Sequence, residues 1–178
     1  NKIRKMRLSV FGSSVTQPTT VWIKDLEAVS GGVSAHMFTN SSFEYCSTAK
    51  LPDSWGTEHW GLRKDSSIAD TDDWRANWGV DDKVRNSGRR SIRITGSNDI
   101  TDTVLSSLWM SLISGKSYTL SVGMRSDVAD MPVDMLVESM GSKQVSVGKQ
   151  WKRYSLTGKI VGSGKYRCWI SSKMEAPL

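Results

Sequence analysis

Near its C-terminus the sequence places an indole beside a guanidinium. Tyr166, Cys168 and Ile170 alternate with Arg167 and Trp169, and side chains in a strand alternate between its two faces. If the first three face a core, Arg167 and Trp169 face water. A flat aromatic ring packs on the C–H face of a sugar, and a planar charged group hydrogen bonds to its hydroxyls. This pair is therefore a candidate site for carbohydrate.

Three more residues extend this candidate site. Alternation in the neighbouring predicted strands places Arg93, Arg125 and Glu138 on outward faces. Arg125 and Glu138 would then hold sugar hydroxyls beside Trp169 on one sheet. The alternative is that Trp169 is covered by long loops in residues 53–90 or by a neighbouring module.

Tryptophan is abundant in this chain. There are eight, and each needs a partner for its N–H when it is fully buried. Trp60, Trp74 and Trp78 lie in the polar segment 58–79, where no alternation assigns them to a core. They are further candidates for sugar binding. The alternative is that they cap the open end of the fold.

Catalysis is not expected. Glycoside hydrolysis needs two carboxylates about 5 to 10 Å apart in one cleft, and the acidic residues here lie mostly in predicted loops. The sequence has no nucleophile elbow, phosphate loop or zinc motif. Cys46 and Cys168, with His36 and His59, are too few for a zinc site. The two thiols are either free or joined in one disulfide.

Composition limits the expected partners. The formal net charge is +6, but 24 Lys and Arg are scattered among 18 acidic residues, so nucleic acid is not expected as a partner. No apolar run approaches the roughly 18 residues needed to cross a bilayer, so no membrane partner is expected either. With 178 residues and 38% apolar content, the chain is predicted to form a globular domain.

The elements that must position these residues are strands. Short, mostly alternating apolar runs are separated by Gly, Ser, Asp and Lys, which is typical of an all-β fold. The segment 104–114 fits a helix or a buried strand, and we predict a strand because β-branched and aromatic residues surround it. Regular short strands favour an antiparallel β-sandwich of the jelly-roll type. The other predicted strands are 91–95, 118–124, 133–137, 144–147, 151–158 and 165–171.

Six motifs follow one another in the chain: NSSFE (40–44), LPDSWG (51–56), SGRRSIRI (87–94), LISGKSYTLSVGMRSD (112–127), VSVGKQWKRYSLTG (145–158) and KYRCWI (165–170). Their order and spacing resemble the jelly-roll carbohydrate-binding modules related to families four, nine, sixteen and twenty-two, within the galactose-binding-domain-like fold. The resemblance implies that Trp22, Trp55 and Trp151 pack in the core. Trp109 is predicted there too, because it lies in the most apolar run.

The resemblance also implies an unusual order of segments. Such modules end with a strand like the one at 19–29 (TTVWIKDLEAV), and residues 5–18 parallel residues 165–178. The first segment is either the tail of a preceding homologous module or a permuted last strand of this one. The expected division is a closing-strand segment at 1–30, a linker at 31–35 and a carbohydrate-binding-module-like β-sandwich at 36–178.

A structural calcium ion is a further implication of the resemblance. Glu44 of the NSSFE motif and Asp25 of the closing strand would hold it, with Asp53 as another oxygen ligand. Lys24 stands where the family usually has an acidic residue. Its ammonium is the alternative to the ion, because a carboxylate taken out of water needs a positive partner.

The residues and the resemblance together predict a noncatalytic module that binds a polysaccharide or other glycan by aromatic stacking and hydrogen bonds. It would belong to a larger secreted or cell-surface protein, as an accessory domain of a glycoside hydrolase, with neighbouring modules of the same polypeptide as partners. The alternative is a structural spacer module that binds no sugar.

Overall fold

The computed structural model describes residues 5–10, 19–34, 40–47, 52–53, 55–58, 78–96, 103–109, 112–137, 140–161 and 168–171. In these parts of the chain all regular structure is β, with twelve strands and no helix. Among the described residues there is accordingly no helix of a length and apolarity that could span a membrane. The all-β class predicted from the alternating pattern is confirmed.

A six-stranded antiparallel sheet forms one layer, which we call the front layer. Its strands, in spatial order, are β11 (Lys152–Lys159), β8 (Ser117–Ser126), β2 (Thr19–Ser30), β6 (Ser91–Gly96) and β5 (Trp78–Asp81), and β3 (Val33–Ser34) pairs with the end of β2. The closing-strand segment predicted at 19–29 is therefore a central strand of this sheet, between β8 and β6.

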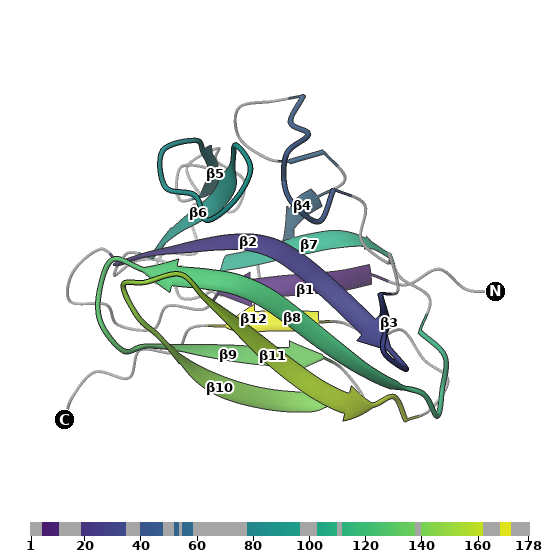
Figure 1. Cartoon of the computed structure of the whole chain (residues 1–178). Helices are drawn as coiled ribbons and strands as arrows, with labels where there is room; N and C mark the ends of the chain where they lie inside the picture. The colour runs from purple at the N-terminus through teal and green to yellow at the C-terminus, as the bar shows by residue number, and fades with distance from the viewer. Residues whose placement is uncertain are drawn as a thin grey trace, which may run out of the picture.

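Two three-stranded antiparallel sheets lie behind the front layer (Figure 1). One contains β1 (Lys5–Val10), β7 (Thr103–Trp109) and β4 (Trp55–Glu58), and the other contains β10 (Gly141–Val147), β9 (Met131–Val137) and β12 (Cys168–Ser171). Strand β1 contacts β12, so the two sheets form one second layer. The arrangement is sandwich-like. Strand β7 covers residues 104–109 of the ambiguous segment 104–114, as predicted for this part, whereas residues 112–114 lie outside any strand.

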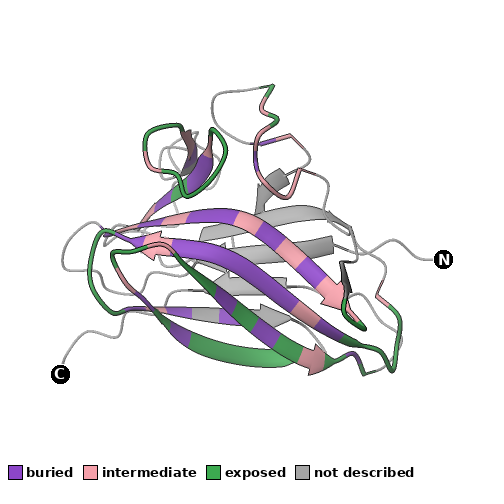
Figure 2. Cartoon of the chain, in the orientation of Figure 1, coloured by how far each residue is buried: buried purple, intermediate pink, exposed green. Residues whose placement is uncertain are grey.

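The hydrophobic core fills the space between these layers. Val122 and Met124 on β8 and Ile92 and Ile94 on β6 are at most 1% exposed. They belong to one cluster with the buried residues of β9 and β10, which are Met131, Val133, Met135, Val145 and Val147. Burial alternates along β2 and β11 (Figure 2), so residues between the core positions lie on the outer face of the front layer.

Strand β2 contains a bulge that separates two stretches of regular pairing. The register against β8 shifts between Lys24 and Glu27, and Asp25 has a left-handed backbone with φ of 51°. Asp tolerates this conformation better than bulky residues. The extra residue returns Leu26 to the core, and the backbone N–H of Leu26 donates to Ser41 in the 40–47 loop.

Candidate functional site

The tryptophans predicted to bind sugar lie mostly beyond what the structure describes. Trp60 and Trp74, together with Glu138 and Arg167, are outside the described residues, and Trp78 and Trp169 are described only by their backbone strands. Trp169 pairs with Leu136 in the second layer, whereas Arg125 is on β8 in the front layer. Trp169 and Arg125 therefore do not share one sheet, contrary to the expected platform. Their roles in binding stay predictions.

The front layer instead aligns an indole between two guanidinium groups. Trp22 on β2 is the register partner of Arg93 on β6 and of Arg125 on β8. Partners in a row project to the same face. The neighbours of Trp22 in the chain, Val21 and Ile23, are fully buried. Arg93 is exposed and Arg125 and Trp22 are half-buried on the outer face, which confirms the outward placement predicted for the two arginines.

Asp81, the last residue of β5, fixes the indole in this row. Its Oδ2 accepts a hydrogen bond of 2.8 Å from Trp22 Nε1, and its Oδ1 accepts from the backbone N–H groups of Lys83 and Val84. Burial raises the pKa of the Asp81 carboxyl, but these three bonds and nearby Arg93 together hold that pKa below its ordinary value. Asp81 is therefore a carboxylate with a positioning role.

Arg125 stacks on the indole of Trp22. The guanidinium carbon lies 5.1 Å from the ring centroid, within the range of a cation–π contact. Its Nε is buried and has no hydrogen-bond partner within the described structure. A buried N–H without a partner loses the hydrogen bond that water would give, which costs about 1–3 kcal/mol.

Trp151 completes this surface on the far side of β8. A Cβ built on Gly123 would lie 3.9 Å from Trp151 Cε3, so the indole lies over the glycine. Trp22 and Trp151 are both half-buried and were expected in the core. That expectation is wrong, because strand alternation gives the inward positions of β2 to Val21 and Ile23. We call Trp22, Asp81, Arg93, Arg125 and Trp151 the outer-face patch.

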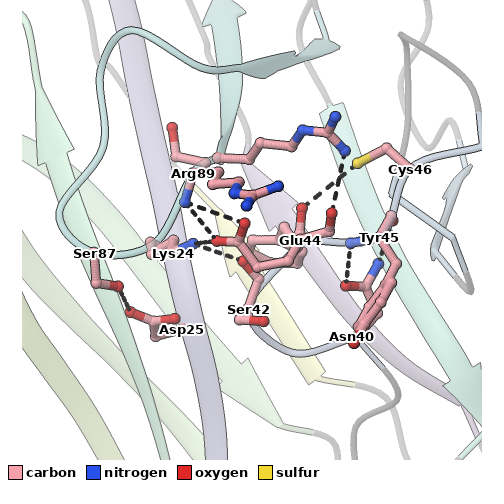
Figure 3. Close-up of polar contacts among 12 residues, drawn as sticks. Lys24, Asp25, Asn40, Ser42, Glu44, Tyr45, Cys46, Ser87 and Arg89 are labelled. Carbon is pink, nitrogen blue, oxygen red and sulfur yellow. Dashed lines mark hydrogen bonds and ion pairs between the residues drawn. The ribbon is translucent and has the colours of Figure 1, made fainter.

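A second group of polar residues closes around Lys24, two positions along β2 from Trp22 (Figure 3). Lys24 is 1% exposed, and its Nζ donates to the carbonyl of Ser42 at 2.8 Å and to Oε1 of Glu44. The backbone N–H of Arg89 donates to both carboxylate oxygens of Glu44, at 3.0 and 3.1 Å. The predicted pairing of Lys24 with Glu44 is present. We call Lys24, Ser42, Glu44 and Arg89 the Lys24 cluster.

The electrostatics of Glu44 match this pairing. Burial raises the pKa of the carboxyl. The hydrogen bonds from Lys24, Arg89 and Arg90 and the charge of Lys24 together lower this pKa by more, so it lies below its ordinary value of 4.5. Gly88 allows the close approach of the loop. A Cβ there would lie 3.1 Å from Lys24 Nζ and would overlap the Glu44 carboxylate, and its φ of +57° is left-handed.

The residues around Lys24 do not fit a calcium ion. An ammonium already holds the carboxylate of Glu44. Asp25 accepts a 2.6 Å hydrogen bond from Ser87 Oγ, and Asp53 accepts from the backbone N–H of Ser47 at 2.7 Å. Across the described ranges no three His, Cys, Asp or Glu residues lie together in a way that could hold a metal. A calcium ion also needs six to eight oxygen ligands.

Cys46 lies in the 40–47 loop and has a free thiol. Its Sγ donates to the carbonyl of Phe43 at 3.5 Å, and burial is the main reason that the thiol pKa is raised. Cys46 therefore has the character of a packed, protonated thiol. The side chain of Cys168 is outside the described set.

Comparison with known proteins yields no match: no family matches the chain, and neither a curated protein nor a solved structure is significantly similar to it.

Proposed function

We propose that this chain is a noncatalytic carbohydrate-binding module with a jelly-roll sandwich, related to families four, nine, sixteen and twenty-two. The outer-face patch is the observation that carries this proposal. It combines indole surface with planar cationic groups on one side of a sheet, which are the groups that recognise sugar rings and hydroxyls.

The patch is preorganised for binding. The Trp22 ring is fixed by its hydrogen bond to Asp81 and by the stacked Arg125, and Trp151 rests on Gly123. Groups that are fixed before binding lose little conformational entropy when the ligand arrives. A ligand would therefore meet a rigid floor formed by strands β2, β6 and β8.

The same arrangement supports binding without hydrolysis. The patch contains one carboxylate, Asp81, and its oxygens already accept three hydrogen bonds, whereas glycoside hydrolysis uses a pair of carboxylates. We place the module in a larger secreted or cell-surface protein, beside neighbouring modules of the same polypeptide. Tandem copies would raise the avidity of a weak single site.

In this proposal Lys24 takes the place of the structural calcium ion that the resemblance implies. The support is that its ammonium joins the carbonyl of Ser42 and the carboxylate of Glu44, where a cation would neutralise the same oxygens. Asp25 and Asp53 then act as hydrogen-bond acceptors in their own turns.

Affinity electrophoresis tests the proposed function. The protein would be run through gels containing β-glucan, xylan, glucuronoxylan, mannan or polygalacturonate. The variants are Trp151→Ala for the outer-face patch, Trp169→Ala for the second layer and the double variant Trp74→Ala with Trp78→Ala. Circular dichroism and urea unfolding would establish that each variant is folded.

We expect retardation by at least one polysaccharide, and loss of that retardation in Trp151→Ala. Loss in one of the other variants instead would move the site to Trp169 or to the 58–79 segment and leave the function intact. No retardation of the folded wild-type protein by any polysaccharide would overturn the proposal in favour of a spacer module.

A further inference from the structure

The outer-face patch carries more positive charge than its own residues neutralise. Arg93 and Arg125 flank Trp22 in one row of the front layer. Neighbouring strands are about 4.8 Å apart, so the two Cα atoms are separated by roughly 10 Å. Arg93 Nη2 lies next to Gly79 of β5, and an arginine side chain is long enough to turn from there toward a group above the indole that Arg125 also reaches.

Neither guanidinium forms an ion pair with another residue that the structure describes. Asp81, the carboxylate of the patch, accepts its hydrogen bonds from Trp22, Lys83 and Val84. Arg93 is near enough to lower the pKa of Asp81, but it is exposed and makes no hydrogen bond to that carboxyl. Arg125 has its ring contact and a buried Nε without a partner. The row therefore offers N–H donors that nothing in the described structure accepts.

Two other cations on the same face, Lys24 and Arg153, are already paired with an anion of the chain, which sets Arg93 and Arg125 apart from them. Lys24 pairs with Glu44. Arg153 on β11 pairs with Glu27 at 2.9 Å and donates from Nε to Ser121 Oγ. Where this sheet uses a cation to stabilise the fold, it provides an anion from the chain. The free donors of Arg93 and Arg125 thus have the character of binding groups.

We propose that the outer-face patch binds an acidic glycan, with a uronate carboxylate between Arg93 and Arg125 and the sugar ring against Trp22. This inference rests on the proposed function and names its ligand class. A guanidinium presents a planar fork of N–H groups that matches a carboxylate in two parallel hydrogen bonds. The net charge of +6 would also attract a polyanion at long range.

A matched pair of polysaccharides measures how much the carboxylate contributes to the affinity. Glucuronoxylan and the same preparation with its uronic acids reduced to neutral sugars share one backbone. Affinities would be measured by calorimetry for the wild type, for Arg93→Gln and for Arg125→Gln. Arg153→Gln is the control, because it removes an arginine of the same sheet that is already paired with Glu27.

We expect the wild type and Arg153→Gln to prefer the acidic polymer by about tenfold or more, since a charge-assisted hydrogen bond contributes that much to an affinity. Either patch variant should lose this preference, because its affinity for the acidic polymer should fall by more than its affinity for the reduced polymer. Polygalacturonate against its methyl ester repeats the test on a second backbone, and preference for the ester-free form there would support the proposal too.

Three results would overturn the inference. Equal binding of glucuronoxylan and its reduced form would do so while leaving the proposed function standing. Equal affinity for dextran sulfate, polyphosphate or single-stranded DNA would show general attraction of polyanions. A preference that survives both patch variants would place the carboxylate elsewhere. Absence of binding to every polysaccharide would instead overturn the proposed function itself.

Discussion

Two groups of charged residues begin from the same strand, and they differ in how their charges are neutralised. In the Lys24 cluster the ammonium is 1% exposed and is neutralised by Glu44 of the 40–47 loop. In the outer-face patch, two positions earlier on β2, Trp22 has Arg93 and Arg125 as its register partners, and neither guanidinium forms an ion pair within the described structure. One group ties loops to the sheet, and the other leaves its donors open.

The difference separates a structural charge from a binding charge. A buried cation must be paired within the chain, because an uncompensated charge in the interior is costly. A half-buried or exposed cation is solvated until a ligand replaces the water. Substitutions in the Lys24 cluster should therefore affect stability. Substitutions of the arginines in the outer-face patch should affect binding.

The largest expected effect is that of Lys24→Met. The variant keeps much of the side-chain volume but leaves the Glu44 carboxylate without its cation, so the free energy of unfolding should fall by about 3–5 kcal/mol. Urea denaturation measures it. Arg125→Met is the matched variant in the patch and should change stability by less than about 1 kcal/mol, because the lost cation–π contact is offset by removal of the unpartnered Nε. Equal losses in both variants would contradict the comparison.

The second prediction concerns Gly88, which makes room for the Lys24–Glu44 pair. Gly88→Ala should lower the free energy of unfolding by about 1–3 kcal/mol, because it adds backbone strain and a Cβ that overlaps the pair. Gly115→Ala is the control: its φ is +82°, but no atom lies within 4 Å of the added Cβ. If the two alanine variants lost the same stability in thermal unfolding, the close approach at Gly88 would contribute nothing.

A smaller effect is expected from acid. The folded-state pKa of Glu44 is below its ordinary value of 4.5, so the ionised carboxylate stabilises the fold above that value, and this stabilisation is lost as the pH falls through the folded pKa. Glu44→Gln should therefore be less stable than the wild type at pH 7 and should lose less stability between pH 5 and 3. Unfolding curves at each pH would show it. Parallel pH profiles for the two proteins would rule out a role for Glu44.

The smallest expected effect is that of removing metal. If Lys24 replaces calcium, EDTA should leave the melting temperature unchanged, and millimolar calcium should not raise it. Calorimetric scans with and without each reagent measure this directly. A ligand that binds the folded state stabilises it. A rise in melting temperature with calcium that EDTA reverses would therefore show that the protein binds calcium and that Lys24 does not replace the ion.

Some of this organisation could be predicted from sequence. Alternation identified the strands and placed Arg93 and Arg125 outward, since that period is a local property of the chain. The pairing of Lys24 with Glu44 is also anticipated, from the resemblance that gives Lys24 a position usually held by an acidic residue. The partnership of Trp22 with Asp81 was not, because it depends on the register of β5, β6 and β2, which are distant in sequence. The sheet to which Trp169 belongs depends on pairing in the same way.

The central position of β2 in the front layer also determines when the sheet can form during folding. During synthesis this strand emerges before both of its partners, β6 and the much later β8, where Val21 pairs with Ile94 and Ser126. Until they emerge, β2 is paired only at its end, with β3, and an unpaired strand edge is prone to pair with another chain. The sheet closes late through contacts of long sequence separation, which are slow to form. We therefore expect the unfolded chain to be most prone to aggregation until β8 is available to pair with β2.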